Sequence, residues 1–151
     1  MNLQKILNRL QKLHPKEIDL SLDRIKNLCK KLGDPQEKLK CISIVGTNGK
    51  YSTIQAIRAI LKEANINVNI YSSPHIQKIN ERFVYNDEEI SDENLAKLLM
   101  EVEEVNNGEP ITYFEILTAA YFYYAKNSDN INLIESGLFH RFDATNIIKE
   151  N

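Results

Sequence analysis

The hydrophobic positions of this chain follow two different spacings. Leucines and isoleucines recur every three or four residues in segments 3–13 and 22–32, which is the period of an amphipathic helix. A third helical segment, 50–64, comes directly after a short apolar run. Continuous apolar runs of this kind are typical of buried strands, and we identify three of them: 41–45, 68–71 and 131–134.

Side-chain caps and turn residues predict the remaining elements. Ser91 is a capping residue for a helix that runs to about Val105. Thr112 and Glu115 form a capping box in front of the apolar stretch "ILTAAYFYYA", which predicts a second helix start. Between strand and helix, "ERFVYNDEEIS" is typical of a short extended excursion that turns at Asn86 and Asp87.

The order of these elements predicts the fold class. Strands that alternate with helices indicate an α/β fold with a parallel, doubly wound sheet. The 151 residues contain no internal repeat and no linker, and the break at "GDPQ" is too short for a domain boundary. We therefore expect one layered unit, of the type that carries phosphate-binding loops.

Composition and charge exclude several classes of function. The 19 basic and 21 acidic side chains give a net charge of -2, which argues against nucleic acid or an anionic membrane as a partner. No apolar run is long enough to span a bilayer, and the amphipathic N-terminal segment is unlike a signal peptide, so we expect a cytoplasmic protein. The two cysteines, Cys29 and Cys41, are then expected to be reduced thiols.

Polar clusters follow each of the three predicted strands. They span residues 46–53, 72–75 and 135–146. Because the carboxyl ends of parallel strands meet at one edge of a sheet, we expect these clusters to lie together and to form a ligand site.

The first cluster contains "GTNGK", which has the chemistry of a phosphate-binding loop. Gly46 and Gly49 would let backbone N–H groups surround phosphate oxygens at a helix start, and Lys50 would add a full positive charge. The loop departs from the complete phosphate-loop pattern, because Ile44 replaces its first glycine and Tyr51 its hydroxyl residue. The alternative interpretation is a tight glycine turn with a solvated lysine.

Seven blocks in fixed order resemble the folylpolyglutamate synthases and dihydrofolate synthases of the Mur ligase superfamily. Together they cover nearly the whole chain, which makes the resemblance specific. The blocks are "IDLSLDR", "GTNGKYST", "SSPHI", "NERF", "ISDE", "TYFEILTAA" and "ESGLFHRFDATN".

This resemblance implies an activity and its cofactors. Enzymes of the family transfer the γ-phosphoryl group of ATP to a carboxylate, with Mg²⁺ as the charge clamp, and glutamate then displaces phosphate to form an amide. The acceptor is either dihydropteroate or a folate. The resemblance further implies that residues 1–151 are the N-terminal portion of a Mur-ligase central ATPase domain, without the C-terminal glutamate-binding domain, which another chain would then have to supply.

The resemblance also assigns candidate site residues, one motif position at a time. Lys50 and Glu135 match the catalytic positions, and Ser73 and Glu135 match magnesium ligands. The positions that match nucleotide contacts are Gly46, Thr47, Asn48, Gly49, Lys50, Ser52 and Thr53. The positions that match contacts to the pterin substrate are Thr112, Phe114, Asp143 and Ala144.

At four positions where the family usually has glycine, this chain has another residue. They are Ser21, Tyr51, Phe139 and His140. The ring of Tyr51 must point away from the nucleotide if the loop is to bind it. The bulky side chains of Phe139 and His140 would crowd the reacting groups. We therefore expect the isolated chain to be inactive as a ligase. The alternatives are an ATP–magnesium-binding remnant without turnover and one subunit of a split ligase.

Overall fold

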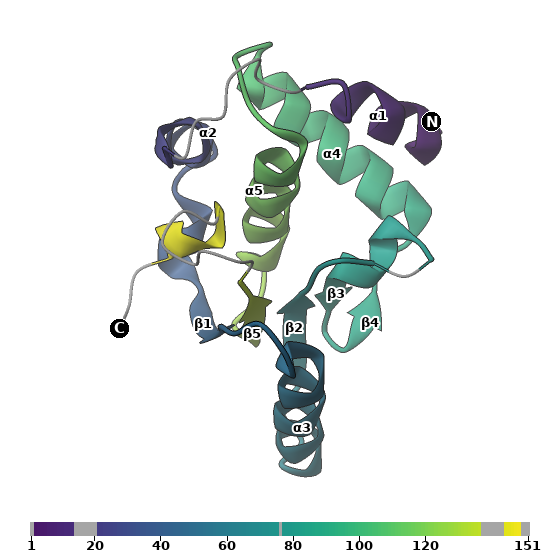
Figure 1. Cartoon of the computed structure of the whole chain (residues 1–151), viewed down its shortest axis with the longest axis vertical. Helices are drawn as coiled ribbons and strands as arrows, with labels where there is room; N and C mark the ends of the chain where they lie inside the picture. The colour runs from purple at the N-terminus through teal and green to yellow at the C-terminus, as the bar shows by residue number, and fades with distance from the viewer. Residues whose placement is uncertain (1, 14–20, 76, 137–143, 149–151) are drawn as a thin grey trace.

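The computed structural model describes residues 2–13, 21–75, 77–136 and 144–148 of the chain (Figure 1). The α-helices are α1 Leu3–Leu10, α2 Asp23–Lys31, α3 Lys50–Glu63, α4 Asp92–Asn106 and α5 Tyr113–Ala125. The strands are β1 Lys40–Ile44, β2 Val68–Tyr71, β3 Phe83–Tyr85, β4 Glu88–Glu89 and β5 Ile131–Glu135. The described residues also form the short 3₁₀ helices η1 Pro35–Lys38, η2 Ile79–Arg82 and η4 Ala144–Ile147.

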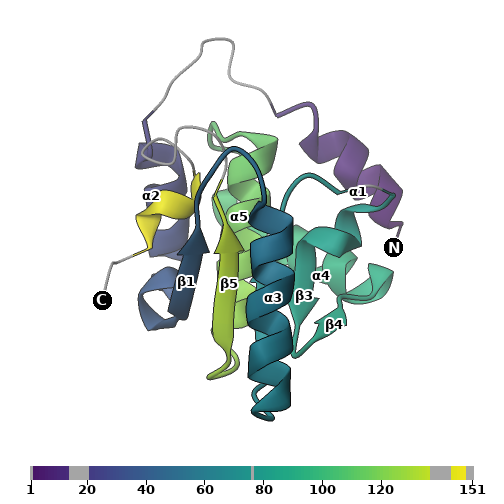
Figure 2. The ribbon, with the colours of Figure 1, turned by 60° about the horizontal axis from the view of Figure 1, so that its bottom comes forward.

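The five described strands form one sheet in the order β1-β5-β2-β3-β4. Strand β5 lies between β1 and β2 and pairs in parallel with both; Figure 2 shows β5 beside β1. The prediction that these three segments are parallel neighbours is confirmed. Strand β5 reaches its central place because α5 covers a face of the sheet as the chain returns, which is how parallel strands are usually joined.

The predicted parallel, doubly wound sheet is confirmed, and the extended excursion adds an antiparallel hairpin at one edge, so the sheet as a whole is mixed. Strands β2, β3 and β4 pair antiparallel in sequence. The turn between β3 and β4 consists of Asn86 and Asp87, with φ of 53° and 64°. Two such left-handed residues make a hairpin turn whose twist matches that of the strands, and asparagine and aspartate tolerate this conformation. The predicted turn is confirmed.

Asp87 also fixes the hairpin to the rest of the molecule. Its carboxylate accepts hydrogen bonds from Arg58 Nε at 2.8 Å and from the backbone N–H of Val68 at 3.1 Å. The hairpin, α3 and β2 are therefore joined at one polar contact.

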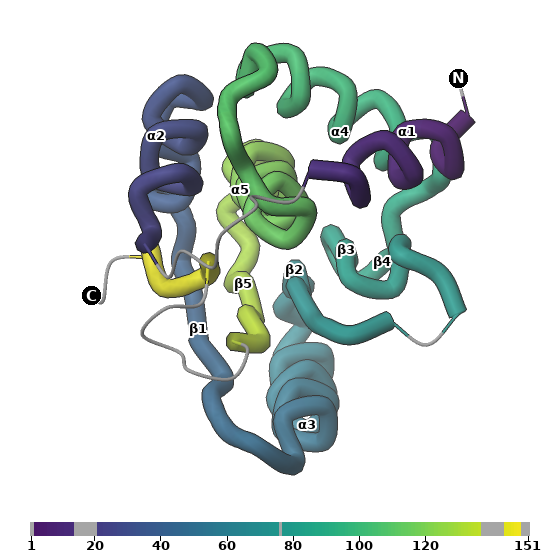
Figure 3. Tube along the Cα trace, turned by 45° about the horizontal axis from the view of Figure 1, so that its top comes forward, coloured from purple at the N-terminus to yellow at the C-terminus, as the bar shows by residue number. Residues whose placement is uncertain are grey.

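Helices cover both faces of the sheet, as expected for a doubly wound fold. Helix α3 packs on one face, where Ile54, Ile70 and Leu133 belong to one small apolar cluster. Helix α5 packs on the other face, where Leu117 and Tyr121 are fully buried in a much larger cluster. Helices α2 and α4 pack against α5, and α1 packs on α4 (Figure 3). Most of the apolar burial that stabilises the fold is therefore on the α5 side.

The predicted helix caps are confirmed. Ser91 Oγ accepts a hydrogen bond from the N–H of Asn94 at 3.2 Å, at the start of α4. At the start of α5, Thr112 Oγ1 accepts from the N–H of Glu115, and Glu115 Oε1 accepts from the N–H of Thr112, both at 3.1 Å. Within the described residues, no helix is both long enough and apolar enough to cross a membrane.

Candidate active site

The carboxyl ends of β1, β5 and β2 lie side by side. Ile44 is the register partner of Glu135, and Tyr71 is the register partner of Ile134. The N–H of Ser136 donates to the carbonyl of Ile44 at 3.0 Å, so the β1–β5 contact continues one residue past the strand. The described parts of the three polar clusters therefore start from one edge of the sheet, as the sequence predicted.

The loop between β1 and α3 depends on a glycine at its last position. Gly49 has a φ of 77° and precedes the first residue of α3. A Cβ atom at this position would meet no other atom within 4 Å, so the backbone conformation rather than lack of space requires glycine. Thr53 Oγ1 donates to the carbonyl of Gly49 at 2.9 Å, which ties the first turn of the helix to the loop. Thr47, Asn48 and Ser52 are exposed.

Lys50 connects the loop to the end of β5. Its ammonium group donates to the carbonyl of Ser136 at 3.1 Å and lies 3.5 Å from Glu135 Oε1. Glu135 is 7% exposed, and its second carboxylate oxygen accepts a hydrogen bond from the N–H of Ser73 at 3.3 Å. Lys50, Ser73 and Glu135, predicted from three separate motifs, are brought together.

The donors at this edge fit a magnesium ion that also binds phosphate. The Glu135 carboxylate and the Ser73 hydroxyl are hard oxygen donors of the kind that Mg²⁺ prefers. Among the residues that the structure describes, no group of three or more histidine, cysteine, aspartate or glutamate side chains could form a metal site. Mg²⁺ usually takes only one or two carboxylates and completes its shell with phosphate oxygens and water, so this sparse set suits a nucleotide-bound ion.

Tyr51 lies outside the loop. It is the second residue of α3, and its side chain is 70% exposed. It lines a groove of about 400 Å³ together with Ser72 and Glu81, between α3 and the hairpin side of the sheet. The ring therefore lies on the surface, at this groove on the hairpin side of the sheet.

The described members of the predicted pterin-contacting set, Thr112, Phe114 and Ala144, lie on the α5 side of the sheet. Phe114 stacks on Tyr71, the last residue of β2, with ring centroids 6.4 Å apart. Ala144 is buried at the start of η4, next to Thr145, whose hydroxyl lies 3.0 Å from that of Ser136. The Thr112 hydroxyl serves the α5 cap. Asp143, Phe139 and His140 lie outside the described residues.

Two arginine contacts near the site were not anticipated from the sequence. Arg24 Nε donates to Glu115 Oε1 at 2.9 Å, so the α5 capping box also joins α2 to α5. Arg82 Nε donates to His75 Nδ1 at 3.1 Å. Both arginines lie within family blocks, "IDLSLDR" and "NERF", which was the signal that could have pointed to them.

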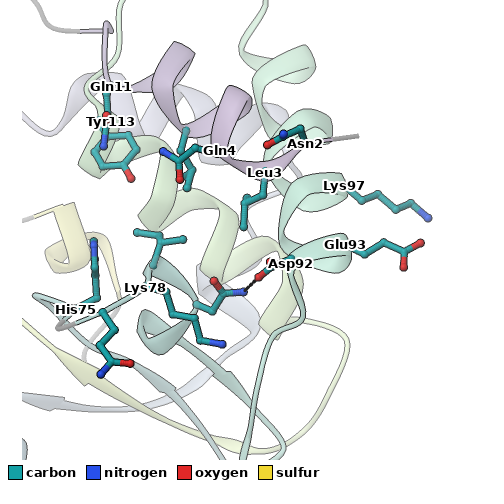
Figure 4. A pocket seen from close by; sticks show the side chains of 14 residues that line it. Asn2, Leu3, Gln4, Gln11, His75, Lys78, Asp92, Glu93, Lys97 and Tyr113 are labelled. Atoms are coloured by element: carbon teal, nitrogen blue, oxygen red, sulfur yellow. Dashed lines mark hydrogen bonds between the residues drawn. The ribbon is translucent and has the colours of Figure 1, made fainter.

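A larger cavity of about 950 Å³ opens on the other side of His75. Figure 4 shows that it lies between α1, the 75–80 segment, the start of α4 and Tyr113. Burial raises the pKa of the Tyr113 hydroxyl, while Arg82 and a hydrogen bond with Gln11 act in the opposite direction. Neither Lys50 nor Glu135 lines this cavity, so it is separate from the polar cluster at the strand ends.

Known proteins of similar sequence have one family in common. No protein-family model matches the chain. A dihydrofolate synthase/folylpolyglutamate synthase of Bacillus subtilis is 37% identical over 137 residues, which are 85% of this chain and 32% of that protein. The corresponding protein of Haemophilus influenzae is 37% identical over 147 residues, 97% of this chain and 33% of that protein. The chain thus spans about a third of the length of these curated relatives.

Solved structures give the same result. A bifunctional folylpolyglutamate synthase/dihydrofolate synthase of Yersinia pestis, complexed with AMPPNP and a Mn ion, has a TM-score of 0.90 and 33% identity. The match covers 98% of this chain and 36% of that one. Escherichia coli FolC in complex with DHPP and ADP has a TM-score of 0.89 and 32% identity, again with 98% of this chain covered and 36% of that one. Over nearly its whole length, the chain is therefore a homologue of the N-terminal part of folylpolyglutamate synthases and dihydrofolate synthases.

Proposed function

We propose that this chain binds ATP with Mg²⁺ and supplies the phosphate-binding part of a ligase that joins glutamate to dihydropteroate or to a folate. Its homologues are ATP-dependent folate ligases. The observation that carries the proposal is the contact of Lys50 with Glu135 and the Ser136 carbonyl beside a glycine loop at a helix start. This arrangement places a cation, a carboxylate and free backbone N–H groups where phosphate and a metal ion would be held.

The proposed reaction has two bond exchanges. A carboxylate oxygen of the acceptor attacks the γ-phosphorus of ATP, the bond to the bridging oxygen breaks, and ADP leaves. The amine nitrogen of glutamate then attacks the acyl carbon, the carbon–oxygen bond to phosphate breaks, and the amine loses a proton as the amide forms. Lys50 and the loop N–H groups stabilise the charge on the phosphoryl oxygens, and a magnesium ion supplies further positive charge when bound.

Each residue has a proposed part in this reaction. Ser73 and Glu135 would hold the magnesium ion, and the segment 46–53 would surround the ATP phosphates. Thr112, Phe114, Asp143 and Ala144 would contact the pterin of the acceptor. The free thiols of Cys29 and Cys41 and the use of ATP both suit the cytoplasm, which we propose as the location.

Calorimetric titration of the 151-residue chain with ATP and Mg²⁺ tests the nucleotide part of the proposal. We expect saturable binding that Lys50→Met weakens at least tenfold. The control is Lys62→Met, which removes another lysine of α3, in its last turn. Because Lys50→Met leaves the buried Glu135 carboxylate without its cation, the double variant Lys50→Met/Glu135→Gln is measured as well. Absence of binding by the wild-type chain at millimolar ATP would contradict the proposal.

Assays of ligase turnover distinguish a subunit of a ligase from an ATP-binding protein without catalysis. The chain spans about a third of its relatives, and we expect no glutamate-dependent release of ADP from it alone with either acceptor. Activity that returns when a polypeptide carrying the remainder of a homologue is added supports a ligase subunit. ATP binding that never leads to turnover supports a binding protein without catalysis. A purified 151-residue chain that ligates glutamate unaided would disprove the dependence on further residues.

A further inference from the structure

Ser136 is a buried residue at which three other elements meet. It follows directly after β5 and is 0% exposed. Its N–H donates to the carbonyl of Ile44 at the end of β1, and its carbonyl accepts a hydrogen bond from the Lys50 ammonium group of α3. Its hydroxyl shares a hydrogen bond of 3.0 Å with the hydroxyl of Thr145 in η4. Ser136 therefore connects the loop lysine to the segment that contains Thr145.

Thr145 is held in place by the apolar core on the α5 side. It is 1% exposed, and its neighbour Ala144 belongs to the large apolar cluster on that side of the sheet. Ile147, in the same short helix, packs against this cluster, and η4 contacts α5 directly. The Thr145 hydroxyl is thus supported by packed elements, and support of this kind fixes the geometry of the group in front of it.

The position of the Lys50 ammonium group depends on what binds it, because a lysine side chain is a compact charge on a long, flexible stem. The group lies 3.1 Å from the Ser136 carbonyl and 3.5 Å from Glu135 Oε1. In the proposed function the Glu135 carboxylate also holds the magnesium ion. The Ser136 carbonyl has no such second task, so it can hold the ammonium group whether or not the carboxylate is engaged elsewhere.

We propose that Thr145 is a positioning residue for Lys50. The hydroxyl pair of Thr145 and Ser136 fixes the Ser136 carbonyl, and this carbonyl holds the Lys50 ammonium group in place for the phosphates of ATP. Thr145 acts through Ser136 and does not itself contact the nucleotide. This inference rests on the proposed function, which assigns Lys50 to the phosphates, and it adds two residues that the sequence did not assign to the site.

A purely structural role would give the hydroxyl pair a different signature. Two buried hydroxyl groups each require a hydrogen-bond partner, and pairing them satisfies both. In that role, removing both hydroxyls together would restore what the removal of one disturbs, because neither hydroxyl of the pair is then left alone. In the positioning role, the double variant still lacks the restraint on the Ser136 carbonyl. Its stability should recover, whereas the contact with Lys50 should not.

Nuclear magnetic resonance of the lysine ammonium groups tests the positioning without a nucleotide. In the 151-residue chain with isotope-labelled lysine, an ammonium group that is held by a hydrogen bond exchanges its protons slowly enough to give a signal at low temperature. Lys50→Met assigns the signal of Lys50. We expect this signal in the wild type and in Thr145→Ser, which keeps the hydroxyl. We expect Thr145→Val and the double variant Ser136→Ala/Thr145→Val to lose it.

The matched control is Thr118→Val. Thr118 is also fully buried, and its hydroxyl lies 3.0 Å from that of Tyr71, but this pair joins α5 to β2 rather than to the residue that holds Lys50. Urea unfolding measures the stability of every variant. We expect Thr118→Val to be destabilised as Thr145→Val is, and to keep the Lys50 signal. If Thr145→Val does not fold, the double variant decides.

The affinity for ATP shows the consequence for the site. In calorimetric titrations with Mg²⁺, we expect Thr145→Val and the double variant to bind ATP about fivefold more weakly than the wild type. This loss is smaller than that expected for Lys50→Met, because the cation is still present. Thr145→Ser and Thr118→Val should bind ATP as the wild type does.

The outcomes separate this inference from the proposed function. A Lys50 signal that is absent from the wild type, or that persists in the double variant, would overturn the positioning even if the wild type binds ATP. Loss of the signal in Thr118→Val would overturn it too, because any buried hydroxyl would then have the same effect. So would an unchanged ATP affinity in variants that have lost the signal. A signal that follows the Thr145 hydroxyl in a chain that does not bind ATP would instead contradict the nucleotide part of the proposed function.

Discussion

At the scale of single residues, Glu135 is the site residue that depends most on its neighbours. It is a carboxylate at the end of an apolar strand, and a buried charge of this kind requires a partner. Lys50 and the N–H of Ser73 supply that partner from the two neighbouring strand ends. The Glu135 carboxylate is therefore held from both sides before any ligand binds, which is the preorganisation that charge stabilisation needs.

We predict that Glu135→Gln removes most of the magnesium dependence of ATP binding. The neutral amide is a poorer ligand for a hard cation, so the gain in ATP affinity on adding Mg²⁺ should fall at least tenfold. Titrations with and without Mg²⁺ measure this difference, and Glu101→Gln on the exposed face of α4 is the control. An unchanged magnesium effect would show that Glu135 is not a metal ligand.

Gly49→Ala should destabilise the fold as well as the site. At a φ of 77° an alanine costs about 1–2 kcal/mol, because its Cβ crowds its own backbone. Urea unfolding should show this loss, whereas Ser52→Ala in the first turn of α3 should change the free energy of unfolding by less than about 0.5 kcal/mol. Equal stability of the wild type and Gly49→Ala would mean that the loop adopts another backbone conformation.

At the scale of elements, helix starts carry both stability and function. The α5 capping box lies at the predicted pterin-contacting position, so loss of the cap and loss of substrate binding are easily confused. The conservative variant separates them, because Thr112→Ser keeps the capping oxygen and Thr112→Ala does not.

We predict that Thr112→Ala lowers the free energy of unfolding by about 1 kcal/mol and that Thr112→Ser has little effect. For a domain of this size, the alanine variant should then melt about 2–4 °C lower. Thermal unfolding followed by circular dichroism measures both variants. A Thr112→Ser protein as unstable as Thr112→Ala would show that the methyl packing, rather than the cap, matters.

At the scale of the whole molecule, the burial of cysteine thiols and tyrosine hydroxyls makes the free energy of unfolding depend on pH. Burial raises the pKa of the Cys29 thiol from 9.0 to about 12 and has the same effect on Cys41. Burial also raises the pKa values of Tyr85 and Tyr121. These groups stay neutral in the folded protein at a pH where they ionise in the unfolded chain. Their stabilising contribution is therefore complete below about pH 9 and is lost as the pH rises toward 12.

We predict a fall in the free energy of unfolding between pH 8 and pH 10 of about 1 kcal/mol for each thiol. Urea unfolding at the two pH values measures this fall. Replacing Cys29 by alanine lowers the stability at both pH values but should reduce the difference between them. A stability that is the same at pH 8 and pH 10 would contradict the burial of the thiols.

The sequence by itself determined the features that depend on neighbours along the chain. Helix periods, the caps at Ser91 and Thr112, and the Asn86–Asp87 turn all follow from contacts within about four residues, and all were confirmed. The family blocks added the convergence of Lys50, Ser73 and Glu135, because the topology of an α/β sheet brings strand ends to one edge.

Tertiary structure alone decided the features that join distant parts of the chain. This group consists of the central position of β5, the antiparallel hairpin edge and the carbonyl of Ser136 as the partner of Lys50. Lys50 and Ser136 are 86 positions apart, and Arg24 and Glu115 are 91 apart. No local pattern encodes such pairs, since they depend on how the layers pack and on which side of the sheet each helix returns.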